Sequence, residues 1–309
     1  MMKYEEFKDA ILKVLQEIYG EEGVTVEENL LKNNGKRYDG LQIRTQERAP
    51  IATVIHLEDI YDEYREKDLD MEGCVREVLR TWAAYPCTEE VIQFADSLNY
   101  WENVRGQVYP ILLGTERNRE LLENLVSEPL LDMSVAYIIR SSRDGKKSYS
   151  VKINRNMLAM YGISEGELHW QAVENMEKDG YRFMDMEDVI MKLIPEVDPD
   201  REVTEGIEML MEPLMRGKMY VLINSVKCYG AAGILNKKLV KEFAGDKDFY
   251  ILPSSVHETI FVPADGRMNR EELDSMVAEI NRSTVVREEW LTDHSYYYDA
   301  AKDEIRVCP

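Results

Sequence analysis

The sequence holds few of the residues that build metal centres and disulfide frameworks. Its 309 residues include four histidines and four cysteines, at Cys74, Cys87, Cys228 and Cys308. No two cysteines form a C-x-x-C pair, which excludes a zinc knuckle and a thioredoxin-like motif. Scattered cysteines without an export signal are typical of reduced thiols. We therefore expect a cytoplasmic protein that uses neither a metal nor a cofactor.

A long apolar run and an apolar leader are also missing. No stretch of about 18 apolar residues occurs, which predicts that no helix crosses a membrane. The first residues, Met1 to Glu6, lack the apolar segment that a secretory signal needs. We therefore expect neither a membrane partner nor export.

Positive charge is scarce. The chain has 38 Lys and Arg against 59 Asp and Glu, a formal net charge of -21. Nucleic-acid binding usually needs a basic stripe, and an acidic protein repels phosphate backbones. The two short basic clusters, 143–147 and Lys237 with Lys238 and Lys241, are typical of solvated faces. We therefore expect no nucleic-acid partner.

The residues that are present describe a soluble globular protein, with 44% hydrophobic and 31% charged residues. In the first part, 1–129, a helical pattern over 3–19 precedes short extended runs at 40–44 and 51–57. Helical patterns then continue to about Val126. This part is predicted to be a small sheet covered by helices.

The second part, 130–309, mixes strands with helices. Two S/N-x-x-E capping boxes predict helix starts, at Ser164 and at Asn269. A hairpin is predicted around Asp144-Gly145 and another over 295–307. An acidic spacer is expected at 195–218. The sequence as a whole predicts an α+β fold, with the second part a mixed α/β structure and the boundary near residue 129. A coarse likeness between 133–178 and 219–281 leaves an internal duplication open.

The richest gathering of reactive side chains lies in 252–263, where the apolar pattern predicts a strand. It holds His257, Glu258, Ser254 and Ser255 between two prolines. In an extended strand His257 shares a face with Ser255 and Thr259, whereas Glu258 points to the opposite face. A Ser255–His257 dyad would need a third group to orient the imidazole.

Two more candidates, Asp293 and His294, lie further along the chain and would supply that orienting group. The alternative is a purely structural role, in which His257 hydrogen-bonds a loop backbone. The segment is not an H-E-x-x-H zinc motif, because Phe261 stands where the second histidine would be. The nearby Gly230-Ala231-Ala232-Gly233 lacks the spacing of a phosphate loop, so close packing is the simpler explanation.

The last third also resembles a known family. The runs that carry the likeness are 220–222, 229–233, 249–258 and 291–299, which read YVL, YGAAG, FYILPSSVHE and LTDHSYYYD. They are similar to the uncharacterised bacterial family DUF5688, and more distantly to DUF1444. The resemblance supplies no reaction. It implies a cytosolic protein of anaerobic Gram-positive bacteria.

Three functions therefore stay open. The first is an intracellular binding or regulatory protein with a protein or small-molecule partner, favoured by the acidic charge and the absence of a complete catalytic set. The second is a hydrolase-like enzyme that uses His257 with Ser255 or Glu258, and with Asp293 or His294. The third is an accessory protein of a mobile element.

Overall fold

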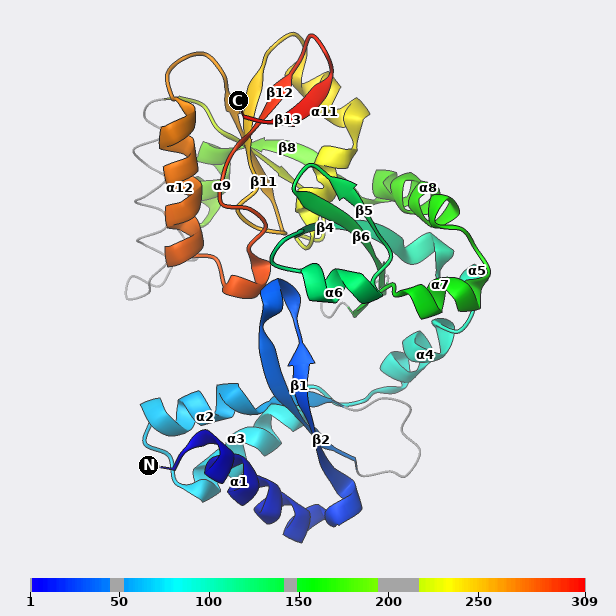
Figure 1. Ribbon diagram of the computed structural model, residues 1–309, viewed down its shortest axis with the longest axis vertical. Helices are drawn as coiled ribbons and strands as arrows, with labels where there is room; N and C mark the ends of the chain where they lie inside the picture. The colour runs from blue at the N-terminus through cyan, green and yellow to red at the C-terminus, as the bar shows by residue number, and fades with distance from the viewer. Residues whose placement is uncertain (1, 45–52, 142–148, 194–216, 309) are drawn as a thin grey trace. The chain divides into compact units, whose positions relative to one another are not determined.

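The computed structural model describes residues 2–44, 53–141, 149–193 and 217–308, with 191–193 described by their backbone alone (Figure 1). The chain forms two compact units, Met1–Tyr100 and Trp101–Pro309. The expected boundary near residue 129 instead lies inside a strand, β5 (Ser127–Leu130). Pro129 suggested a break, but β5 is an edge strand, where a proline is tolerated.

The first unit is a three-stranded antiparallel sheet covered by helices, as predicted. Its strands are β1 (Val24–Leu31), β2 (Arg37–Ile43) and β3 (Val54–His56). Its helices are α1 (Tyr4–Tyr19), α2 (Leu57–Glu66), α3 (Met71–Ala84) and α4 (Glu89–Ser97), with 3-10 turns η1 (Glu21–Gly23) and η2 (Asn33–Gly35). The apolar stripe of α1, with Phe7, Ile11 and Leu15 fully buried, packs with Leu41 and Val78 into the core.

The second unit begins with a small antiparallel sheet of four strands. These are β4 (Val108–Gly114), β5, β6 (Met133–Arg140) and β7 (Ser150–Lys152), and all eight residues of β6 are buried. The elements around it are α5 (Trp101–Val104), η3 (Arg105–Gln107), α6 (Arg119–Asn124), α7 (Arg155–Tyr161), α8 (Glu165–Met176) and η4 (Glu177–Asp179). The pairing of β6 with β7 agrees with the predicted hairpin, whose Asp144-Gly145 turn falls outside the described residues.

The second unit also holds a six-stranded antiparallel sheet in the order β13-β12-β10-β11-β9-β8. Its strands are β8 (Arg182–Asp185), β9 (Tyr220–Ile223), β10 (Phe249–Leu252), β11 (Thr259–Pro263), β12 (Tyr296–Asp299) and β13 (Glu304–Val307). The helical elements of this region are α9 (Met186–Leu193), η6 (Gly230–Leu235), α11 (Lys237–Ala244), α12 (Arg270–Ser283) and η7 (Arg287–Glu289).

Helices cover both faces of the six-stranded sheet (Figure 1). On β11, Ile260 and Val262 pack in one apolar cluster with Leu273 of α12. The intervening Phe261 points to the other face, where its ring lies 6.0 Å from that of Phe243 in α11. The alternation expected of a strand therefore holds within β11 and fixes which side chains face which helix.

The fold is α+β, and every strand pair among the described residues is antiparallel. The predicted hairpin at the end of the chain is confirmed by β12 and β13. The expected acidic spacer, 195–218, lies almost entirely outside the described residues. Within the part of the chain that is described, no helix is both long and apolar enough to cross a bilayer.

Candidate functional site

The segment predicted as one strand, 252–263, is a turn followed by a strand. β10 ends at Leu252 and β11 begins at Thr259. Between them Ser255 forms a bridge with Trp290, and the Val256 amide donates to the Glu289 carbonyl at 2.9 Å. The expected shared face of Ser255, His257 and Thr259 is therefore wrong, because the backbone leaves the sheet after Leu252, pairs with the 289–292 segment, and rejoins the sheet only at Thr259.

His257 lies in that turn, with a quarter of its side chain exposed. The Tyr229 amide donates to its Nδ1 at 3.2 Å, and its Nε2 lies 3.2 Å from Oε1 of Glu289. A hydrogen bond with the Cys228 thiol and the charge of Glu289 raise the pKa of His257 to about 9, against the opposing effect of burial. Three chain segments thus meet at this imidazole.

The side chain of Asn224 holds the Cys228 backbone. Its Nδ2 donates to the Cys228 carbonyl at 2.8 Å, and its Oδ1 accepts from the Cys228 backbone amide at 3.2 Å. Asn224 also donates to Asp179 at 3.1 Å, and Asp179 forms a buried ion pair with Arg140. A buried polar chain therefore fixes the cysteine, which itself is only half-buried.

The backbone around Cys228 adopts an unusual conformation. Lys227 and Tyr229, the residues on either side, both have φ of 54°, in the left-handed region that few side chains adopt. Gly230 follows, and a Cβ there would lie 2.4 Å from the carbonyl oxygen of His257. Close packing, as expected, explains this glycine: only hydrogen fits where the loop meets the histidine turn.

The predicted serines do not face the imidazole. Ser255 is buried, and its hydroxyl oxygen accepts from the backbone amide of His257 at 3.0 Å. It also hydrogen-bonds Glu258, whose pKa is raised by burial. The Ser254 carbonyl accepts from the Leu291 amide, and its side chain is buried. These residues shape the turn, because the Ser255 hydroxyl contacts both the His257 backbone amide and the Glu258 carboxylate.

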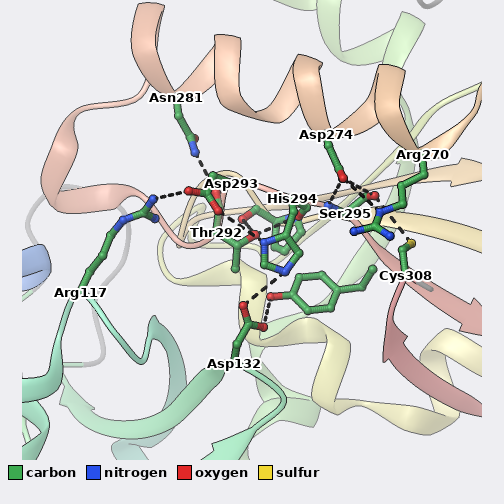
Figure 2. A network of polar contacts seen from close by, with 12 residues as sticks. Arg117, Asp132, Arg270, Asp274, Asn281, Thr292, Asp293, His294, Ser295 and Cys308 are labelled. Carbon is green, nitrogen blue, oxygen red and sulfur yellow. Dashed lines mark hydrogen bonds and ion pairs between the residues drawn. The ribbon is translucent and has the colours of Figure 1, made fainter.

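Asp293 and His294 belong to a different set of contacts (Figure 2). Arg117 binds Asp293 at 2.7 Å, and Nε2 of His294 lies 3.3 Å from Asp132. The Tyr296 hydroxyl donates to Asp132 at 2.5 Å. Because 253–256 and 289–292 pair antiparallel, His257 and His294 lie beyond opposite ends of the paired segment. The structure does not bring the two histidines together.

The remaining contacts in Figure 2 hold the last strands against α12. Asp274 accepts from both the amide and the hydroxyl of Ser295 at 2.6 Å, and it pairs with Arg270 at 3.2 Å. Asn281 donates to the Thr292 carbonyl at 2.7 Å. These contacts join α12 to the residues around Thr292 and Ser295, which is the pattern of a structural network.

A cavity of about 340 Å³ lies elsewhere in the second unit. It opens among α8, the β5–β6 turn, η6 with α11, and the β12–β13 hairpin. Most of its lining is apolar, and the apolar residues are Leu130, Leu131, Val173, Ile234, Leu235, Val240 and Ile305. Leu131 stays 42% exposed, which leaves a large apolar side chain in contact with water at this cavity.

The polar lining of the cavity combines paired groups with one lysine and with the exposed carboxylate of Glu304. Asp303 accepts from the Tyr298 hydroxyl at 2.8 Å and binds Lys241 at 3.2 Å. His169 hydrogen-bonds Tyr137 at 3.0 Å and also contacts Glu128. Lys237 is exposed and lies at the start of α11. Among the described residues that line the cavity, no other is a lysine or an arginine.

Two residues at His257, Cys228 and Glu289, were not predicted from the sequence. Cys228 lies 29 positions before His257, and Glu289 lies 32 positions after it. Only the pairing of 289–292 with the histidine turn brings the carboxylate to the ring. The glycine-rich run after Cys228 gave a partial signal, since it indicated close packing at this loop. Among the described residues, no group of His, Cys, Asp and Glu side chains is arranged to hold a metal.

Comparison with known proteins gives one match. A family described as a family of unknown function (DUF5688) matches residues 4–300, which agrees with the resemblance seen in the sequence. The more distant likeness to DUF1444 stays an expectation. No curated protein and no solved structure matches the chain.

Proposed function

Since the chain belongs to the DUF5688 family of unknown function, we propose from its geometry that it binds a small amphipathic carboxylate in the cavity beside α8 and α11. The observation that carries the proposal is an apolar cavity with a lysine at its polar edge. Its volume, about 340 Å³, lies within the range of roughly 300–1,000 Å³ typical of ligand pockets. This is the small-ligand form of the binding function expected from the sequence.

The size of the cavity sets the size of the ligand. A water molecule occupies about 30 Å³ in the liquid, so the space corresponds to roughly ten water-sized groups. A fatty-acid anion such as octanoate has about ten heavy atoms, which matches that count. Its chain would cover Val173 and Ile234, and burial of apolar surface would supply most of the binding free energy.

Lys237 gives a carboxylate at the polar end of the ligand a cation to pair with, while Asp303 and Glu304 add two carboxylates to the lining. Among the described residues Lys237 acts on Asp303 through its charge, and the hydrogen bonds from Tyr298 and Lys241 together with that charge lower the pKa of Asp303. A bound carboxylate would pair with Lys237 and leave the ion pair between Asp303 and Lys241 in place. The basic cluster that the sequence indicated as a solvated face thus acquires a role at the cavity edge.

We also propose that this binding takes place in the cytoplasm. All four cysteines lie among the described residues and all are free thiols, which suits a reducing compartment.

Calorimetric titration with octanoate tests the proposal. The wild-type chain is expected to bind with a Kd on the order of 0.1 mM, the range set by ligand efficiency for so small a molecule. Val173→Phe would fill the cavity and should weaken binding at least about tenfold. Lys237→Gln should weaken octanoate binding about threefold to tenfold but leave binding of octanol, which has no charge, unchanged.

Lys238→Gln is the matched control, because Lys238 is exposed on the same helix turn but does not line the cavity. Its affinity should equal that of the wild type. The proposal is wrong if wild-type protein shows no heat of binding at millimolar octanoate, or if Val173→Phe binds as tightly as wild type.

A further inference from the structure

We propose that Leu131, at the tip of the β5–β6 hairpin, is the residue through which the cavity selects a ligand with an apolar tail. Its side chain covers the tail of the bound molecule, and Asp132 holds the turn that presents it. The inference rests on the proposed binding of an amphipathic ligand in this cavity, and it adds the residue that determines which tails are accepted.

The backbone of Leu131 is strained. Leu130 pairs with Met133, so Leu131 and Asp132 form the two-residue turn between the strands. Leu131 has φ of 58°, in the left-handed region, where the Cβ atom crowds the following carbonyl oxygen. Glycine, asparagine or aspartate usually occupies such a turn position, because each tolerates a positive φ at lower cost. Leucine therefore costs folding free energy that glycine would not.

The side chain of Leu131 recovers little of that cost by packing. It remains 42% exposed, so only part of its apolar surface is removed from water. An exposed leucine is ordinary by itself, but here the exposure is combined with a strained backbone. Strain of this kind is common at ligand-binding sites, and Leu131 lines the cavity. Ligand binding explains why a leucine is present at this position.

Neighbouring contacts fix the turn in its strained conformation. The Thr115 amide donates to the Asp132 carbonyl at 3.1 Å. The Asp132 carboxylate accepts from the Tyr296 hydroxyl at 2.5 Å and lies 3.3 Å from Nε2 of His294 (Figure 2). A strained residue persists only where the surrounding structure holds it firmly. Asp132 is therefore a positioning residue, which keeps Leu131 at the cavity.

An apolar side chain held at the cavity selects by polarity and not by charge. The tail of a bound ligand covers the exposed part of Leu131, and the removal of that surface from water favours binding. A polar tail would lose its hydration there without gaining a hydrogen bond. Because the turn is already formed, no backbone has to be ordered when the ligand binds. Selection by Leu131 is thus independent of the pairing between Lys237 and the carboxylate.

Calorimetric titration of Leu131→Ala and Leu131→Gly with octanoate and with octanol tests this selection. Both variants should bind both ligands about fourfold to fifteenfold more weakly, the equivalent of one or two buried methylene groups. Lys237→Gln, by contrast, should affect octanoate alone. Met160→Ala is the matched control, because Met160 is 53% exposed but does not line the cavity. It should bind both ligands like the wild type.

Thermal unfolding of Leu131→Ala and Leu131→Gly without ligand tests the strain. Alanine removes the apolar side chain but keeps a Cβ atom, whereas glycine removes the strain as well. Leu131→Gly should therefore unfold about 2–4 °C above Leu131→Ala, which reverses the usual order of these two residues.

A double variant tests the positioning role of Asp132. Asp132→Ala should weaken octanoate binding about as much as Leu131→Gly, and the double variant should bind no more weakly than either single one, because both changes remove the same contact. A purely structural role would not produce this lack of additivity. Losses of affinity that multiply in the double variant would overturn the positioning role.

The outcomes separate this inference from the proposed function. A wild type that binds neither ligand overturns the proposed binding and the role of Leu131 with it. If the wild type binds both ligands, and Leu131→Ala and Leu131→Gly bind them as tightly, only the role of Leu131 is wrong. Unfolding of Leu131→Gly below Leu131→Ala would contradict the strain at the turn.

Discussion

At the scale of single residues, the tyrosines near the end of the described chain each have an acidic partner. The three consecutive tyrosines of β12 each donate to a different aspartate: Tyr296 to Asp132, Tyr297 to Asp248 and Tyr298 to Asp303. Tyr296 and Tyr298 are buried, so leaving either hydroxyl without an acceptor would cost several kcal/mol of folding free energy, on the order of the cost of burying a polar group without a hydrogen bond. The excess of acids thus has structural uses, beyond keeping the protein soluble.

The raised pKa of His257 predicts a pH-dependent stability. The pKa is about 9 in the folded chain and about 6.5 when unfolded, so folding favours the protonated ring. This stabilisation is fully present below pH 6.5 and disappears as the pH rises through 9. The wild type should exceed His257→Gln in unfolding free energy by on the order of 1–3 kcal/mol near pH 6, and by much less near pH 10.

Urea unfolding at these two pH values measures the difference. The replacement of histidine by glutamine also changes packing, but that effect is the same at both pH values and cancels. A gap between wild type and His257→Gln that stays constant from pH 6 to pH 10 would contradict the contacts assigned to the ring.

At the scale of elements, a glycine at the end of a strand and a glycine in the first turn of a helix should respond oppositely to alanine. A Cβ on Gly114, at the end of β4, would lie 2.5 Å from the Leu291 carbonyl oxygen, which is backbone and cannot rotate away. A Cβ on Gly166, in the first turn of α8, would have nothing within 4 Å. Gly114→Ala should therefore destabilise the protein by about 1–3 kcal/mol through overpacking.

Gly166→Ala should instead stabilise the protein by up to about 1 kcal/mol, because alanine loses less backbone entropy than glycine in a helix. Thermal unfolding of the two variants side by side is the measurement. If Gly114→Ala unfolds at the wild-type temperature, the close approach of β4 to the 291 backbone is wrong.

The elements that the sequence predicted are those whose signals are local. Ser164 and Asn269 cap α8 and α12 through the predicted capping boxes, because each box uses only four adjacent residues. β1 was harder to predict, since Val24 is its one fully buried residue and a bulge between Glu27 and Leu30 interrupts the alternation. A strand with so little buried surface has almost no period-two pattern.

The candidate site shows the same limit more sharply. The sequence led to His257, whose neighbours Ser255 and Glu258 are adjacent in the chain. The contacts of its ring, however, come from Cys228 and Glu289 through non-local pairing. The apolar pattern predicts one strand over 252–263. The structure has a turn between Leu252 and Thr259, so strand alternation does not determine which side chains surround the His257 ring. Register between distant segments depends on packing, which a single sequence does not display.

At the scale of the whole molecule, the cavity and the His257 turn both lie in the second unit, Trp101–Pro309. The cavity and the His257 turn are connected through one short element, η6. Its first residue, Gly230, packs against the carbonyl of His257, and its last residues, Ile234 and Leu235, line the cavity. The first unit has its own covered sheet and its own core.

The most direct test of ligand binding is a methyl NMR titration of the full chain with octanoate. The account predicts saturable shifts in the methyl resonances of Val173, Ile234, Leu235 and Val240, four of the aliphatic residues that line the cavity. The methyl groups of Ile11 and Leu15, in the core of the first unit, should not move. Shifts confined to other residues, or no shifts at millimolar octanoate, would contradict the assignment of this cavity as the binding site.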